Sequence, residues 1–271
     1  MSFYGTAKAM GELSKAAANF AILNVDADPA IGNFTPGELA QLRKGGANRV
    51  LSYLNLGACE QFRSYWAQAP AGLLPCKANK AAQLGPYAGY PNEVWMNPAN
   101  QAWRALILQH IAPRLVAQGI DGFYLDNLEL VEHGPTDGNG PCDAACRQGG
   151  LGLVAALRAH YPQLLLVMQN ATSAVTRQAV VDGVKFASLL DGVAREQALW
   201  PGDVAVQQEL AAWQALGLQP GGRPFWVGTL DYVGHCGAKA AAEQVFAKAK
   251  AAGLSPYVTD KSGGQQVVCY W

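Results

Sequence analysis

Short apolar segments alternate with helical segments along the whole chain, and this alternation constrains the fold more than any other feature. The segments with strand character are 20–25, 49–56, 93–96, 120–125, 164–168, 191–196, 224–230 and 254–258. Parallel strands need such a returning segment after each strand. Eight units in 271 residues predict an α/β fold, a single (β/α)8 TIM barrel over 1–271 with long loops at the C-terminal face. An open doubly wound sheet is the alternative, but we find no phosphate-type glycine fingerprint or switch point.

The segment 119–129 is the most informative of these units. A helical pattern over 101–118 runs into Gly119, the residue type expected just past a helix C-terminus. Residues 120–125 are β-branched, aromatic and aliphatic, and Asp126, Asn127 and Glu129 follow them. Parallel α/β folds place their chemistry at this end of the strands. A helix-capping role for Asp126 is the alternative.

Composition narrows the class of protein. Half of the residues are hydrophobic, 15% are charged and the formal net charge is zero, so we expect a globular chain. The cations form no basic stripe, which argues against nucleic acid as a partner. No apolar run approaches the roughly 20 residues that span a bilayer. The first residues do not resemble a signal peptide, so we expect either a cytosolic protein or one whose signal has been removed.

The six cysteines favour a protein whose signal has been removed over a cytosolic protein. Most lie in loops rich in Gly, Pro and Asn, which is typical of disulfides in an oxidising compartment. We favour pairings between neighbouring loops: Cys59 with Cys76, Cys142 with Cys146, and Cys236 with Cys269. Zinc binding is disfavoured, because Cys142 and Cys146 have no second close pair and the histidines show no zinc-like spacing.

Acidic and amide residues lie at or just after the C-terminal ends of most predicted strands. They are Asp26, Asp28, Glu60, Asp126, Glu129, Gln169, Asn170, Glu196, Asp231 and Asp260. Two carboxylates that face each other across a barrel mouth are the working groups of glycoside hydrolysis. Aromatic residues lie beside them, among them Tyr53, Trp66, Tyr124, Trp200 and Tyr232. Sugar rings stack on such side chains, although each aromatic taken singly is better explained as core or loop packing.

These motifs resemble those of a known family. Segment 53–66 is similar to the second-strand motif of glycoside hydrolase family 114, the endo-α-1,4-polygalactosaminidases, and 119–127 resembles its fourth-strand motif. Gln169 with Asn170, the run 191–193 before Glu196, and 230–233 match its pattern in order. The resemblance covers 20–260. The chain departs from the pattern at Ala58, where many relatives carry an acidic residue, and 69–90 shows no pattern that aligns.

The resemblance implies a retaining endo-glycosidase that acts on α-1,4-linked galactosamine polymers, of the galactosaminogalactan exopolysaccharide type. By position, Asp126 would be the nucleophile and Glu196 the general acid/base. It also implies an extracellular or periplasmic protein that needs no cofactor. A galactosamine polymer is a polycation, so a mouth lined by acidic groups should attract it. We expect the substrate to be held by Asp26, Asp28, Glu60, Tyr124, Asn127, Asn170, Asp231 and Tyr232.

Two other function classes stay open at this point. One is a carbohydrate-binding barrel that keeps the cleft but has no turnover. The other is a metal-assisted hydrolase with Asp26, Asp126 and Asp231 as oxygen ligands. We expect the protein to be a monomer, to have a long loop of little structure over 69–90, and to contain no second domain.

Overall fold

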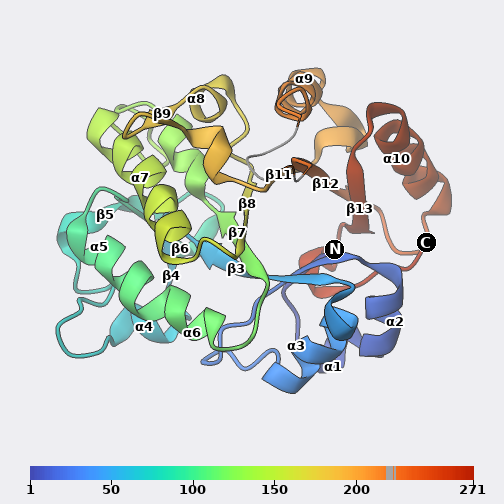
Figure 1. The fold of residues 1–271 in the computed structure, drawn as a ribbon, viewed down its shortest axis with the longest axis horizontal. Helices are drawn as coiled ribbons and strands as arrows, with labels where there is room; N and C mark the ends of the chain where they lie inside the picture. The colour runs from blue at the N-terminus through green and yellow to red at the C-terminus, as the bar shows by residue number, and fades with distance from the viewer. Residues whose placement is uncertain (218–221, 223) are drawn as a thin grey trace.

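The structure is a computed structural model that describes residues 1–217, 222 and 224–271. Eight parallel strands form one sheet, with the helices around its outside (Figure 1). In sheet order these strands are β1 (Ser2–Phe3), β2 (Ile22–Val25), β3 (Arg49–Asn55), β7 (Gly122–Asp126), β8 (Leu165–Gln169), β11 (Gly192–Glu196), β12 (Trp226–Val233) and β13 (Ser255–Asp260). This confirms the predicted (β/α)8 barrel.

The two end strands of this order, β1 and β13, are bridged by the C-terminal segment. The Tyr4 backbone N–H donates to the Gln265 carbonyl at 2.7 Å. The Ser2 hydroxyl donates to Oε1 of the same glutamine at 2.5 Å. Gln265 therefore helps to close the barrel and lies beside its mouth.

One predicted barrel strand is wrong. Segment 93–96 belongs to β6 (Tyr90–Met96), which pairs antiparallel with β4 (Ala58–Glu60) and β5 (Gln83–Tyr87) outside the barrel. We call these three strands the accessory sheet. The eighth barrel strand is β1, which has only two residues and therefore shows no periodic pattern. The predicted loop over 69–90 is also wrong in part, because β5 lies within it.

Several helices start at residues whose side chains cap them, among them Thr6, Thr35 and Asp143. Thr35 and Glu38 form a capping box: Glu38 N donates to Thr35 Oγ1 at 3.3 Å and Thr35 N donates to Glu38 Oε2 at 2.7 Å. No helix in the described ranges is both long and apolar enough to cross a membrane.

The helices are α1 (Ala7–Met10), α2 (Leu13–Asn19), α3 (Pro36–Arg43), α4 (Ser64–Ala67), α5 (Gln101–Leu106), α6 (Ala112–Val116), α7 (Ala144–His160), α8 (Ala174–Arg177), α9 (Val204–Gln214) and α10 (Lys239–Ala252). A small hairpin joins β9 (Val180–Val181) to β10 (Val184–Lys185).

Side chains fill the barrel below its mouth. Leu51, Tyr124, Val167 and Ala194 form one buried cluster from four adjacent strands. Side chains two apart in a strand point to the same face, so Tyr124 lies one layer beneath Asp126. The side chains of the catalytic candidates therefore lie above a layer of packed core side chains.

Candidate active site

A cavity of about 460 Å³ opens at the C-terminal ends of the barrel strands, and it brings Asp126 and Glu196 together. Asp126 is the last residue of β7 and Glu196 the last residue of β11, with β8 between them in the sheet. Both side chains are partly exposed. Two carboxylates 70 positions apart in sequence therefore face the same space, as glycoside hydrolysis requires.

Three side chains hold the Glu196 carboxylate in place. Tyr232 donates from its hydroxyl to Oε1 at 2.5 Å, and Gln265 donates from Nε2 to the same oxygen at 3.2 Å. Asn170 donates from Nδ2 to Oε2 at 3.0 Å. Burial and the Glu196 charge both raise the pKa of Tyr232 well above its usual range, so its hydroxyl stays a donor.

Asp126 lies in an electrostatic environment that favours its protonated form. Burial is the main cause of a pKa well above the usual range, and the carboxylates of Glu129 and Glu196 raise the pKa further. The next residue, Asn127, is left-handed with φ 57°. Gly57 allows this turn to approach β3, because a Cβ at Gly57 would lie 1.9 Å from the Asn127 carbonyl oxygen.

The accessory sheet brings two further groups to this turn. Asn127 Nδ2 donates to Oε2 of Glu93, from β6, at 3.3 Å. The Tyr87 hydroxyl, at the end of β5, donates to Oε1 of Glu129 at 3.3 Å. Burial is the main cause that raises the pKa of Glu93 and of Glu129 to about 7. The insertion after β3 therefore adds one carboxylate, Glu93, near Asp126 and one hydrogen-bond donor, Tyr87, to Glu129.

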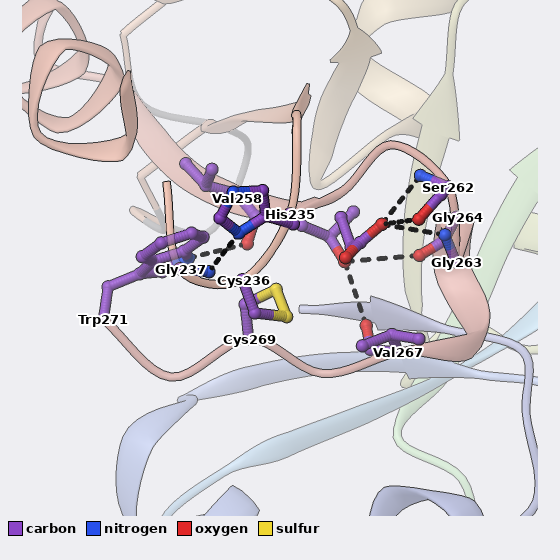
Figure 2. The surroundings of a disulfide bond; sticks show 12 residues. His235, Cys236, Gly237, Val258, Ser262, Gly263, Gly264, Val267, Cys269 and Trp271 are labelled. Atoms are coloured by element: carbon purple, nitrogen blue, oxygen red, sulfur yellow. Dashed lines mark hydrogen bonds between the residues drawn. A yellow bond between two sulfur atoms is a disulfide. The ribbon is translucent and has the colours of Figure 1, made fainter. Parts of the chain in front are cut away.

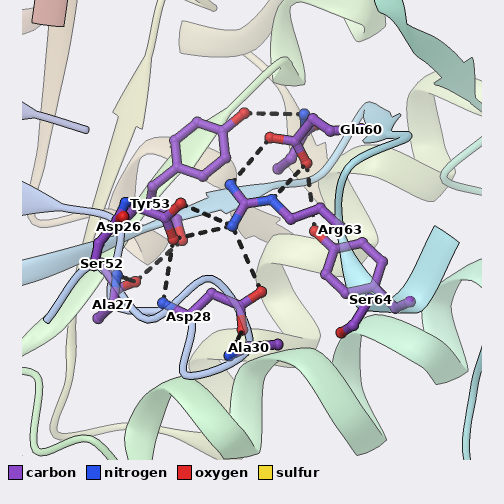
Figure 3. A network of polar contacts seen from close by, with 12 residues as sticks. Asp26, Ala27, Asp28, Ala30, Ser52, Tyr53, Glu60, Arg63 and Ser64 are labelled. Carbon is purple, nitrogen blue, oxygen red and sulfur yellow. Dashed lines mark hydrogen bonds and ion pairs between the residues drawn. The ribbon is translucent and has the colours of Figure 1, made fainter. Parts of the chain in front are cut away.

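Arg63 pairs with a second group of acidic residues, two of which line the cavity (Figure 3). Its Nη1 lies 2.9 Å from Asp26 Oδ2 and its Nη2 lies 3.2 Å from Glu60 Oε1. Asp28 is paired with Arg114 and lies 3.5 Å from Arg63. All these carboxylates are buried. Figure 3 shows the Arg63 guanidinium between Asp26 and Glu60, so its single positive charge compensates part of the charge of both carboxylates.

The structure separates the predicted substrate-binding residues into two groups. Asp26, Glu60, Asn127, Asn170 and Tyr232 line the cavity. Asp28, Tyr124 and Asp231 do not line it. Asp231 is fully buried, where Oδ1 accepts hydrogen bonds from the backbone of Leu199 at 2.8 Å and Trp200 at 2.9 Å.

Other lining residues were missed by the sequence analysis. They are Tyr4, Ile31, Asn33, Phe62, Arg63, Tyr87, Tyr90, Glu93, Gln265 and Gln266. Phe62 and Tyr90 are 59% and 54% exposed, so their rings are available to a ligand at the mouth. A sequence signal for Tyr90 and Glu93 was present, because 87–93 contains aromatic and acidic residues. The segment was predicted to be part loop and part barrel strand, so these side chains were not assigned to the site.

The family model described as glycoside-hydrolase family GH114 matches residues 8–271. The chain belongs to this family. An uncharacterized protein of Deinococcus radiodurans is 32% identical over 248 residues, which cover 87% of this chain and 72% of that protein.

Solved structures share the GH114 chain's fold. The glycoside hydrolase domain of PelA from Pseudomonas aeruginosa has a TM-score of 0.70 at 17% identity, over 98% of this chain and 95% of that one. Ega3 of Aspergillus fumigatus, solved in complex with galactosamine, has a TM-score of 0.66 at 16% identity, over 100% of this chain and 92% of that one. Their likeness supports the barrel, and the family assignment makes the chain a glycoside hydrolase.

Three disulfides fasten the loops of this GH114 barrel in the pairing favoured from the sequence: Cys59–Cys76, Cys142–Cys146 and Cys236–Cys269. The first joins β4 of the accessory sheet to the segment after α4. Figure 2 shows the third, which ties the loop after β12 to the C-terminal tail. Disulfides of this number are typical of proteins in oxidising compartments.

The carboxylates do not form the metal site considered above. Asp26 is paired with Arg63, and Asp231 accepts backbone hydrogen bonds away from the cavity. In the described part of the chain, no group of three or more His, Cys, Asp or Glu residues is arranged to hold a metal ion.

Proposed function

We propose that this GH114 chain is a retaining endo-glycosidase that hydrolyses α-1,4-linked galactosamine polymers, with Asp126 as nucleophile and Glu196 as general acid/base. The observation that carries the proposal is the composition of the shared cavity. Five carboxylates line it (Asp26, Glu60, Glu93, Asp126 and Glu196), and Arg63 is the one cation among its described lining residues. Arg63 pairs with Asp26 and Glu60, so the remaining excess of acidic groups is smaller than the count of carboxylates, and a concave site with that excess favours a cationic sugar. The galactosamine bound to Ega3 supports the same substrate class.

The proposed reaction has two steps. Glu196 donates a proton to the glycosidic oxygen as the bond from that oxygen to the anomeric carbon breaks, and an Asp126 oxygen bonds to the same carbon. Glu196, now a carboxylate, then takes a proton from water. The water oxygen attacks the anomeric carbon, the bond to Asp126 breaks, and both carboxyl groups return to their starting states.

A cationic substrate also supports the chemistry of Asp126. Burial and neighbouring carboxylates favour its protonated form, which is not nucleophilic. An ammonium group bound in the same cavity acts in the opposite direction, because a nearby positive charge favours the ionised carboxylate. A polymer without amines lacks this effect, so we expect it to be a poor substrate even where its shape fits.

The three disulfides favour an oxidising compartment, so we propose that the protein acts on an exopolysaccharide in the periplasm or outside the cell. In such a compartment the salt concentration affects how tightly the polymer binds. Binding of a polycation to an acidic cleft weakens as ionic strength rises.

The proposal is tested by incubating the protein with de-N-acetylated α-1,4-galactosamine polymer and following the products by mass spectrometry. Wild type should release oligosaccharides, and Asp126→Asn and Glu196→Gln should each lower the rate by about a thousandfold or more while thermal unfolding stays normal. NMR of the first products should show the anomeric configuration of the substrate.

Other outcomes would separate the alternatives. Binding of the polymer by wild type and variants without products would indicate a carbohydrate-binding barrel. Loss of wild-type cleavage with a chelator would revive the metal-assisted hydrolase. Near-normal turnover by either variant would show that the assigned pair is wrong.

A further inference from the structure

A second cavity of about 850 Å³ adjoins the first at the barrel mouth. The two cavities share six lining residues: Tyr4, Tyr90, Glu196, Tyr232, Gln265 and Gln266. Asp126 lines only the first cavity, whereas Glu196 lines both. Glu196 therefore stands at the junction of a continuous cleft, and each arm of that cleft can hold part of a polymer.

The two arms differ in charge. The first arm carries the five carboxylates and Arg63 described above. In the second arm, only Glu196 and Lys261 are charged among the described lining residues. Apart from Pro201, the rest of that arm is aromatic, amide or glycine in character, including Trp200, Gln197 and Gly264. Such surfaces suit uncharged sugar rings, whose apolar faces stack on aromatic side chains.

The wall that carries Lys261 is held in a fixed shape. Lys261 follows β13, and its backbone N–H donates to the Val233 carbonyl at 2.7 Å. The neighbouring Asp260 is engaged in its own turn, where Oδ1 accepts from Ser262 N at 2.7 Å and from Gly263 N at 2.9 Å. The Cys236–Cys269 disulfide anchors the adjoining loop to the tail, as Figure 2 shows. The Asp260 carboxylate is therefore held by its own turn, next to Lys261 in the chain.

The chemistry assigns a direction to the cleft, and this step rests on the proposed function. The sugar attacked by Asp126 must lie in the first arm, because Asp126 lines only that arm. The leaving sugar lies beyond the oxygen that Glu196 protonates, and we place it in the second arm, which Glu196 also lines. The acidic arm thus receives the sugar that forms the new reducing end, and the Lys261 arm receives the sugar that forms the new non-reducing end.

We propose that the enzyme cleaves preferentially where an amine-bearing sugar is followed, toward the reducing end, by an uncharged sugar, and that Lys261 is a specificity-determining residue of the leaving-group arm. A protonated amine in that arm meets the Lys261 ammonium, and like charges repel. An N-acetylated or neutral hexose carries no such charge. The preferred substrate is therefore a partly N-acetylated or mixed polymer rather than a fully deacetylated one.

The test is digestion of a partly N-acetylated α-1,4-galactosamine polymer in ¹⁸O water, with both new ends sequenced by tandem mass spectrometry. Wild type should give amine-bearing sugars at labelled reducing ends and uncharged sugars at new non-reducing ends, each enriched over the polymer's composition. Lys261→Glu should raise the share of amines at new non-reducing ends by roughly 3- to 10-fold. Lys250→Glu, an exposed change of the same kind in α10, should leave the pattern unchanged.

The outcomes distinguish this inference from the function on which it rests. New non-reducing ends at the polymer's bulk composition, or an unchanged pattern with Lys261→Glu, would overturn the inference and leave the glycosidase standing. No cleavage of this polymer or of the fully deacetylated polymer would overturn the proposed function, and the inference with it.

Discussion

Asn170 and Glu196 exchange two hydrogen bonds across adjacent strand ends. Asn170 Nδ2 donates to Glu196 Oε2 at 3.0 Å, and the Glu196 backbone N–H donates to Asn170 Oδ1 at 3.1 Å. Asn170 adopts a left-handed conformation, φ 63°, which asparagine tolerates better than most residues. This single side chain therefore fixes both the backbone and the carboxylate of the proposed acid/base.

Replacement of Asn170 should impair turnover more than binding. Asn170→Gly keeps the left-handed backbone but loses both hydrogen bonds. We expect kcat to fall by about 10- to 100-fold with KM within about twofold, because a misplaced catalytic group slows the chemical step. Asp182→Gly is the matched control, since Asp182 is left-handed, with φ 49°, and exposed in the β9–β10 hairpin. Equal losses in the two variants would point to a general backbone effect.

Arg63 should be far more important for stability than an exposed arginine. Arg63→Met leaves Asp26, Asp28 and Glu60 buried with less compensating charge, which we expect to cost about 3–5 kcal/mol at pH 7. Arg43→Met is the control. It breaks the Arg43–Asp121 pair, whose arginine side chain is 39% exposed, and should cost about 1 kcal/mol or less. Urea unfolding of both variants gives the comparison.

The pH dependence of the Arg63 variant provides a second check. Burial raises the pKa of Asp26 even beside Arg63, and loss of the arginine raises it further. Protonation of Asp26 then removes its unpaired charge, so the loss in Arg63→Met should shrink between pH 7 and pH 4. A loss that is the same at both pH values would show that packing, and not charge, sets the role of Arg63.

The fold was predictable because each strand–helix unit is marked by residue patterns within its own segment of the sequence. Gly119 ends the helix before β7 with φ 84°, as a glycine after a helix should, and the apolar run that follows is strand. The order of the units then predicts a barrel. Local signals do not distinguish a barrel strand from an accessory strand, however. The Glu93–Met96 pattern is that of any short half-buried strand, and its antiparallel partners are set by tertiary contacts.

The site was predictable only where it follows a strand with a clear pattern. Asp126, Asn170 and Glu196 could be placed because strand ends of a barrel converge. Tyr4 and Gln265 come from the two ends of the chain, and they reach the cavity only because the Tyr4–Gln265 backbone contact bridges the end strands. The charge of Asp26 and Glu60 was misjudged for a related reason, since their neutralisation depends on how Arg63 folds back between them.

Glu93 should make the protein less stable at high pH. Its pKa rises from 4.5 in an unfolded chain to about 7, chiefly through burial. Between these values the folded protein holds a proton that the unfolded chain has lost, so this contribution to stability falls as pH rises through 7. Glu93→Gln cannot ionise. Relative to wild type, its free energy of unfolding should therefore be higher at pH 8 than at pH 4.

Denaturant unfolding at pH 4 and pH 8 measures this difference directly. Glu243→Gln, an exposed change in α10, is the control and should show no such pH dependence. A relative stability of Glu93→Gln that does not change with pH would mean that Glu93 ionises normally. The same variant should bind a galactosamine polymer more weakly at pH 8, where it lacks a charge that wild type carries.

Gly57 should be needed for the close approach of the turn that follows Asp126. A Cβ at this position would lie 1.9 Å from the Asn127 carbonyl oxygen and 2.9 Å from its carbon, which forces backbone and not a flexible side chain to move. We expect Gly57→Ala to cost about 1–3 kcal/mol of stability and to lower kcat by about 10- to 100-fold, because Asp126 moves with the turn. Gly37→Ala is the control: its Cβ meets only Thr35 Oγ1 at 4.0 Å, in the first turn of α3, where alanine favours the helix. Equal stability and activity of the two variants, measured by urea unfolding and product release, would show that the β3–β7 contact does not position Asp126.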